Sequence, residues 1–206
     1  MFASLAVGAG LCGWVAICLL LSRAAERRAT RAEPPMPWVP VALAVPLVVI
    51  ALVVRPNLAA AAASGVACIA LVVAAWADAR TGFIFDALTL PAGALAASLA
   101  ALSGAGGEAA AGVTLLVGTF GALVVFSRGR WMGLGDVKAM YALGAAFGPT
   151  ESLVALLAAC ACGIVAAAWH GKLQRGYEVR FGPHLAAGAA FALAAGAPLV
   201  HGIMGF

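Results

Sequence analysis

Long apolar segments separated by short polar ones run along the chain, and eight of them approach the ~20 residues that a helix needs to cross a bilayer. They are Phe2–Ser22, Trp38–Val54, Leu58–Ala77, Ala87–Ser103, Ala109–Ser127, Val137–Gly148, Ser152–Trp169 and Pro183–Ile203. The longest polar stretch between them, Arg23–Pro37, is too short to form a domain with its own core. The pattern therefore predicts an all-α, polytopic membrane protein with about eight transmembrane helices, of which the sixth is the shortest.

Composition supports this prediction, since 65% of the 206 residues are hydrophobic and only 10% are charged. In a soluble domain about a quarter of the residues are charged, so the composition excludes an ordinary water-soluble enzyme and a disordered chain alike. The formal net charge of +4 is too small for a nucleic-acid-binding surface, and we predict no nucleic-acid partner. The five cysteines lie in apolar segments without CxxC spacing, which favours buried packing over zinc or disulfide chemistry.

The basic residues predict how the chain is oriented in the membrane. If the eight segments alternate in direction, all of the 12 lysines and arginines except Arg55 fall in loops on one side. By the positive-inside rule, that side is the cytoplasm and both termini lie on the other. Residues 1–57 then contain two N-terminal transmembrane helices joined by a basic cytoplasmic loop, and residues 58–206 form a second unit.

Acidic residues are rare enough for each to be considered as a candidate for chemistry. The five glutamates lie in polar loops or outer turns, among them Glu108 and Glu151, which is typical of solvated surface charges. Asp78 and Asp136 instead lie at the edges of apolar segments, and two crossings separate them, so both reach the cytoplasmic side. Ionisable groups at membrane depth are costly and indicate function. Two carboxyl groups in one site can hydrolyse a peptide bond, one ionised to deprotonate water and one protonated to assist the carbonyl.

Other interpretations of the two aspartates are open at this point. Asp136 could cap the helix that follows it, and Asp78 could be an interfacial residue at the end of its span. Intramembrane acids also couple protons in transporters. Gly133 and Gly135 favour catalysis, because two missing side chains before Asp136 let a substrate backbone approach. Helix dipoles suggest that Asp136, at a helix amino end, is the ionised base and that Asp78, at a carboxyl end, is the protonated acid.

Three short blocks of sequence carry a resemblance to a known family. They are Asp78-Ala79-Arg80-Thr81-Gly82-Phe83-Ile84 with Leu88-Thr89-Leu90-Pro91, then Gly133-Leu134-Gly135-Asp136-Val137-Lys138, then Phe181-Gly182-Pro183. In this order they resemble the type IV prepilin peptidase family of GxGD-type membrane aspartic proteases. The resemblance implies that Asp78 and Asp136 are the catalytic pair and that residues 58–206 are the peptidase core. It also implies a substrate, the amino-terminal leader of pilin-like precursors, cut at the cytoplasmic face of the bacterial inner membrane.

Four further residues in these blocks are predicted to bind the substrate or to shape the site: Gly133, Gly135, Lys138 and Pro183. Asp86 is predicted to be polar but not catalytic, and Lys138 to extend towards the cytoplasmic boundary. The sequence departs from the family at Phe85, where proline is usual, and at His184, where an apolar residue is usual. Neither residue is assigned a role.

The absence of other motifs narrows the predicted function. No P-loop, GxSxG or HExxH pattern occurs, and no His/Cys cluster has metal-ligand spacing, so we predict neither a metal nor a cofactor. The predicted partners are pilin-like precursors and the lipid bilayer. Larger family members that also methylate the product carry a cysteine-rich domain where this chain has only residues 23–37, so we expect peptidase activity alone. The alternatives are a small proton-coupled transporter and a non-catalytic component of a pilus or secretion assembly.

Overall fold

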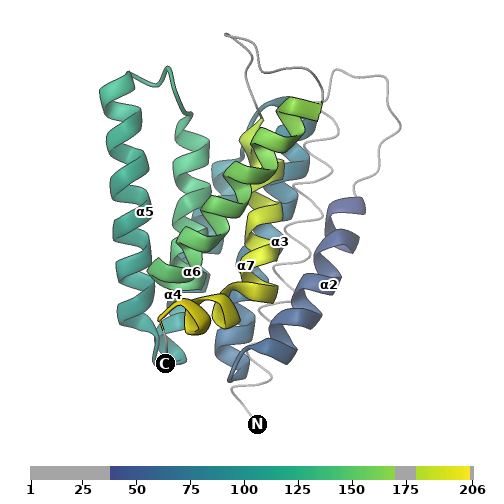
Figure 1. Cartoon of the computed structure of the whole chain (residues 1–206), viewed down its shortest axis with the longest axis vertical. Coiled ribbons are helices and arrows are strands. Elements are labelled where there is room, and N and C mark those ends of the chain that lie inside the picture. The colour runs from purple at the N-terminus through teal and green to yellow at the C-terminus, as the bar shows by residue number, and fades with distance from the viewer. Residues whose placement is uncertain (1–37, 170–179, 205–206) are drawn as a thin grey trace.

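Helices form every regular element in the part of the chain that the computed structural model describes, residues 38–169 and 180–204 (Figure 1). They are α2 (Val39–Val54), α3 (Leu58–Thr81), α4 (Asp86–Leu102), α5 (Gly106–Ser127), α6 (Leu134–Trp169) and α7 (Phe181–Met204). The all-α prediction is confirmed for these ranges. The first predicted span, Phe2–Ser22, and the polar stretch Arg23–Pro37 lie outside the described residues.

The lengths and composition of the helices indicate a membrane protein. Three helices, α3, α5 and α6, are long and apolar enough to cross a bilayer, whereas α2, α4 and the Phe181–Gly196 part of α7 are apolar but shorter. These lengths do not establish eight crossings, and that number stays a prediction. The expectation that the cysteines are buried is confirmed for Cys68 but is wrong for Cys160 and Cys162, which lie exposed on the second half of α6.

The sixth and seventh predicted spans are the two halves of α6, joined across a sharp kink. Gly148 has φ 66° and ψ −174°, a conformation that glycine adopts without steric cost. Pro149 follows it and has no backbone N–H with which to continue the helical hydrogen bonds. The Ser152 hydroxyl donates to the Leu143 carbonyl (3.3 Å) and so satisfies one carbonyl at the break. In Figure 1 the two halves form a V, the first half beside α5 and the second leaning away from it.

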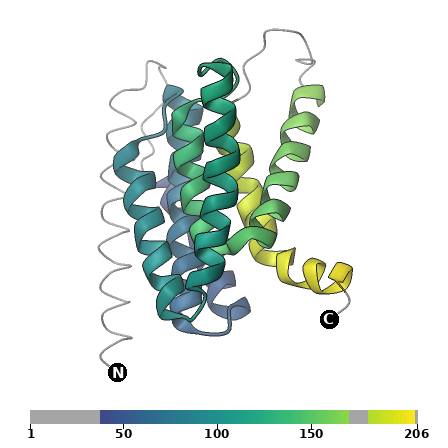
Figure 2. The same ribbon diagram turned by 90° about the vertical axis from the view of Figure 1, so that its left-hand side faces the viewer.

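Close packing of small side chains joins the helices into one bundle. Residues 61–71 of α3 are all buried, and α3 packs against α2, α4, α6 and α7. Figure 2 shows α4, α5 and the first half of α6 as neighbouring, nearly parallel helices. Where α5 crosses α6, a Cβ added to Gly144 would lie 2.7 Å from the carbonyl carbon of Gly112, closer than side chains tolerate. Small residues therefore allow the backbones to approach, as is common for helices in lipid.

Candidate active site

Three helix ends meet at the same end of the bundle: the carboxyl end of α3 and the amino ends of α6 and α7 (Figure 1). Both aspartates lie there, each inside a helix. The sequence pattern ended the third span at Ala77, but α3 continues to Thr81, so Asp78 lies one turn before its end. The helix ends there because Gly82, at φ 72°, adopts the left-handed conformation and donates its N–H to the Asp78 carbonyl (2.9 Å).

Asp78 is a buried residue, with only 8% of its surface exposed. Its Oδ2 accepts a hydrogen bond from the backbone N–H of Gly182, in the first turn of α7 (3.1 Å). Gly182 has to be a glycine for this approach, since an added Cβ would lie 2.9 Å from Oδ2 and 3.0 Å from the Asp78 Cβ. Burial and this tertiary hydrogen bond do not fit the interpretation of Asp78 as a solvated interfacial residue.

Asp136 lies in the first turn of α6 as its third residue, partly buried. Its backbone N–H donates to the Gly133 carbonyl (3.2 Å), so the helix begins at Leu134 and not at Val137. The interpretation of Asp136 as the cap of the following helix is therefore wrong, because the helix has already begun. The Asp78 and Asp136 side chains lie at this same end of the bundle, close enough for their charges to interact.

The two glycines of the GxGD motif have different surroundings. A Cβ on Gly133 would lie 3.8 Å from Oδ2 of Asp136, an ordinary contact distance, so this position borders the carboxylate. A Cβ on Gly135 would lie 3.1 Å from Cβ of Ile84. Gly135 therefore serves the packing of α6 against the segment between α3 and α4, whereas Gly133 leaves space beside Asp136.

The other two predicted site-shaping residues, Lys138 and Pro183, have contacts away from the carboxyl groups of Asp78 and Asp136. The Lys138 ammonium forms an ion pair with the Asp86 carboxylate at the start of α4 (2.6 Å). Pro183 lines an apolar groove of about 380 Å³ between α2, α3 and α7, together with Trp76 and Ala79. The structure thus brings Asp78, Asp136 and Gly133 together, with Lys138 engaged elsewhere.

Arg180 is a residue of the site that sequence reasoning missed. Its guanidinium donates to the backbone carbonyl of Asp78 (2.9 Å) and also to that of Ala79. These carbonyls lie in the last turn of α3, and that of Asp78 also accepts the Gly82 N–H. The sequence could have pointed to Arg180 only through its position, directly before the third family block, Phe181-Gly182-Pro183.

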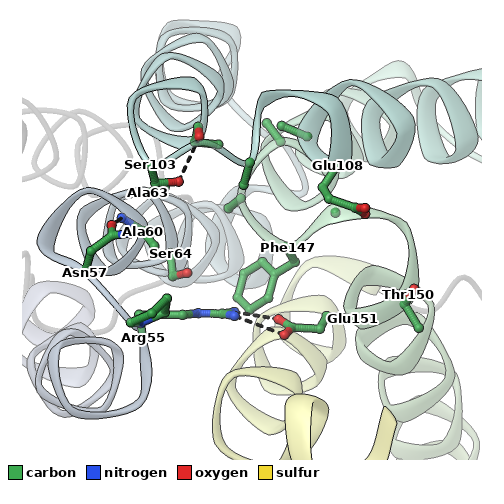
Figure 3. Close-up of a pocket in the computed structure, with 17 residues that line it drawn as sticks. Arg55, Asn57, Ala60, Ala63, Ser64, Ser103, Glu108, Phe147, Thr150 and Glu151 are labelled. Carbon is green, nitrogen blue, oxygen red and sulfur yellow. Dashed lines mark hydrogen bonds and ion pairs between the residues drawn. The ribbon is translucent and has the colours of Figure 1, made fainter. Parts of the chain in front are cut away.

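A second cavity, of about 330 Å³, lies at the opposite end of the bundle, beyond the amino end of α3 (Figure 3). Asn57 and Asp78 are 21 residues apart along the chain, which corresponds to about 30 Å of helix. Here Arg55 pairs with Glu151 through two contacts of 3.0 Å and 2.5 Å, and its guanidinium lies over the Phe147 ring at 5.3 Å. The expectation that Glu151 is a solvated charge is wrong, because its side chain is only 16% exposed.

The residues described contain no group of three or more His, Cys, Asp or Glu side chains that could hold a metal ion. Two carboxylates alone form a poor site for zinc.

The long apolar helices indicate a membrane protein, and Asp78 and Asp136 lie at one end of its bundle, close enough for their charges to interact. Residues 65–168, half of the chain, match the type IV leader peptidase family, and the chain belongs to that family. Both Asp78 and Asp136 lie within the matched residues.

Curated relatives agree with the family. The prepilin leader peptidase/N-methyltransferases of Burkholderia pseudomallei strains 1026b and K96243 are each 38% identical to this chain over 153 residues. The match covers 69% of this chain and 49% of each relative, so the chain spans about half the length of the curated relatives it matches. No solved structure shows a significant match.

Proposed function

We propose that this protein is a membrane aspartic endopeptidase that removes the amino-terminal leader of type IV pilin-like precursors. The observation that carries the proposal is the meeting of Asp78, from α3, and Asp136, from α6, at one end of the bundle, inside the region that matches the family. The relatives are N-methyltransferases as well as leader peptidases by name, and our proposal concerns the peptidase activity alone.

The two carboxyl groups divide the work of hydrolysis. The ionised one accepts a proton from a water molecule while the water oxygen attacks the carbonyl carbon of the scissile bond. The protonated one donates to the carbonyl oxygen as the tetrahedral intermediate forms. Breakdown of that intermediate breaks the C–N bond. The leaving amine takes up the proton that came from water, and the carboxyl group that donated its proton regains one from a hydroxyl of the intermediate.

The site is proposed to lie at the cytoplasmic face of the bacterial inner membrane. This follows from the positive-inside orientation, which places Arg128, Arg130 and Arg180 at the same end as the two aspartates. A pilin-like precursor has its leader in the cytoplasm and its apolar helix in the membrane, so the scissile bond lies at the depth of Asp78 and Asp136. In this proposal residues 58–206 form the peptidase core, and eight helices cross the membrane.

Cleavage of a purified prepilin by the purified protein in detergent or liposomes tests this function. Asp78→Asn and Asp136→Asn should each lower kcat/KM by at least about 1,000-fold, because groups that act as a unit lose nearly all activity together. Asp86→Asn, a matched change of an exposed aspartate at the same end of the bundle, should retain most of the activity.

Two outcomes would contradict the proposal. Release of the leader at a normal rate by either variant of the pair would show that the two aspartates are not catalytic. A well-folded wild-type protein that releases no leader from any prepilin would favour a transporter or a non-catalytic component of a pilus or secretion assembly.

A further inference from the structure

The amino end of α7 holds Asp78 through two of its residues, Gly182 and Arg180. The Gly182 N–H donates to the side-chain Oδ2 at 3.1 Å, and the Arg180 guanidinium donates to the backbone carbonyls of Asp78 and Ala79. Gly182 and Arg180 come from more than 100 residues further along the chain. One helix end therefore positions both the carboxylate and the backbone that carries it.

A backbone N–H can only donate a hydrogen bond, so it favours an acceptor oxygen and disfavours a proton on Oδ2. Hydrogen bonds from N–H groups to ionised carboxylates are also stronger than those to neutral ones. The amino end of α7 adds the positive end of its helix dipole at the same carboxylate. All three effects favour the ionised form of Asp78 and so oppose the effect of its burial, which disfavours a charge.

Helix dipoles alone predict the opposite assignment, with Asp78 as the protonated acid, since Asp78 is near the carboxyl end of α3. Arg180 weakens this dipole effect, because its guanidinium donates to the carbonyls at the end of α3 and offsets their negative partial charge. Asp136 keeps the benefit of its own helix amino end, but Lys138, its basic neighbour along α6, is engaged with Asp86.

We infer that Arg180 and Gly182 are positioning residues, and that the Arg180 guanidinium and the Gly182 N–H keep Asp78 ionised. Asp78 is then the base that activates water, and Asp136 is the acid. The inference rests on the proposed peptidase function. Arg180 and Gly182 act through Asp78 and do not themselves touch the substrate.

Other charged groups near Asp78 enter the same balance. Asp136 approaches from α6, and His184 approaches from α7, one turn beyond Arg180. Arg80 lies on α3 itself, with its guanidinium over the Trp76 ring at 5.5 Å. At the start of α4, Asp86 is paired with Lys138. The test therefore includes a His184→Gln variant, which removes the imidazole from this balance.

The test is the pH dependence of kcat/KM for prepilin cleavage, with Arg180→Gln and Gly182→Ala as the variants. Activity requires one ionised and one protonated carboxyl group, so the acidic limb reports ionisation of the base and the alkaline limb that of the acid. If Asp78 is the base, both variants shift the acidic limb upward by about one pH unit, so that activity is lost at low pH and largely recovers at higher pH. Arg180→Lys should restore much of the wild-type profile.

Matched controls separate this effect from a general loss of structure. Gly118→Ala places a Cβ in open space on α5, and Arg128→Gln removes an exposed arginine at the same end of the bundle. Both should keep the wild-type profile. His184→Gln identifies any part of the acidic limb that comes from the imidazole.

Two results would overturn the inference. A shift of the alkaline limb alone would show that Asp78 is the acid. An equal loss of activity at every pH would show that Arg180 and Gly182 have a purely structural role. Asp78→Asn and Asp136→Asn are measured in parallel. If these two are inactive and Arg180→Gln has a normal profile, the inference fails while the peptidase function stands.

Discussion

The charged residues at the two ends of α3 have different neighbours. At one end Asp78 is buried beside another acid, whereas at the other end Arg55 and Glu151 neutralise each other with side chains 14% and 16% exposed. Pairing of opposite charges stabilises a fold, but placing like charges together does not. The aspartate pair is therefore a cost to stability, which the proposed catalytic function would explain, whereas the Arg55–Glu151 pair is part of the structure.

Replacing Arg55 tests whether the Arg55–Glu151 pair stabilises the fold. Arg55→Met leaves the Glu151 carboxylate partly buried without its partner and should lower the free energy of unfolding by about 2 kcal/mol. The double variant Arg55→Met/Glu151→Leu should lose less than Arg55→Met alone. Lys138→Met, which breaks a pair whose Asp86 partner is 59% exposed, should change stability by less than about 0.5 kcal/mol.

Unfolding in detergent, followed by circular dichroism or thermal shift, measures these differences. Equal stability of Arg55→Met and the wild type would mean that the pair contributes nothing. The Lys138 variant serves here as a control for stability only.

At the scale of elements, the contacts between helices depend on missing side chains. The backbones of α5 and α6 approach each other at Gly112 and Gly144, and α6 turns back at Gly148. The break at Gly148 lets the second half of α6 reach α7 while the first half stays beside α5. The arrangement of α6 in turn determines where Asp136, at its start, meets the end of α3.

A methyl group at this crossing should disturb the bundle. A Cβ added to Gly112 would lie 2.7 Å from the Gly148 carbonyl carbon, so Gly112→Ala should lower the free energy of unfolding by about 1–3 kcal/mol, as overpacking usually does. Gly118→Ala, on the same helix with nothing within 4 Å, should leave stability unchanged or slightly raised, because alanine favours helix.

The same unfolding assay decides between these outcomes. If the two alanine variants are equally stable, the close approach of α5 and α6 is not what holds these helices together.

At the scale of the whole molecule, the positive-inside rule predicts that the end of the bundle with Asp78 and Asp136 faces the cytoplasm. The turn between α4 and α5 and the turn between α5 and α6 lie at opposite ends of the bundle (Figure 2). Labelling with a membrane-impermeant maleimide, in a variant whose native cysteines are replaced by alanine, tests this. Gly107→Cys should react in intact spheroplasts, and Trp131→Cys should react only after the membrane is permeabilised.

Each position is a control for the other in that experiment. Reaction of Trp131→Cys in intact spheroplasts, with Gly107→Cys protected, would reverse the orientation. Reaction of both from the same side would show that α5 does not cross the membrane.

Much of the fold and part of the site could be predicted from the sequence. Apolar segment lengths predicted the helices, the break near Gly148 and the membrane environment, because these depend on local composition. The number of crossings between Asp78 and Asp136 predicted that both lie on one side. Errors at the helix ends were small but mattered, since Asp78 and Asp136 lie inside helices that extend beyond the most apolar residues.

Only the tertiary structure showed which side chains meet. The contact of Arg180 and Gly182 with Asp78, and that of Arg55 with Glu151, join residues about 100 positions apart. Such contacts depend on how each helix is rotated about its axis. In most helices of this chain apolar residues surround the whole circumference, so no polar stripe marks the outward face and the sequence pattern does not specify the rotation. Packing of the small residues against one another decides it, and with it the surroundings of Asp78.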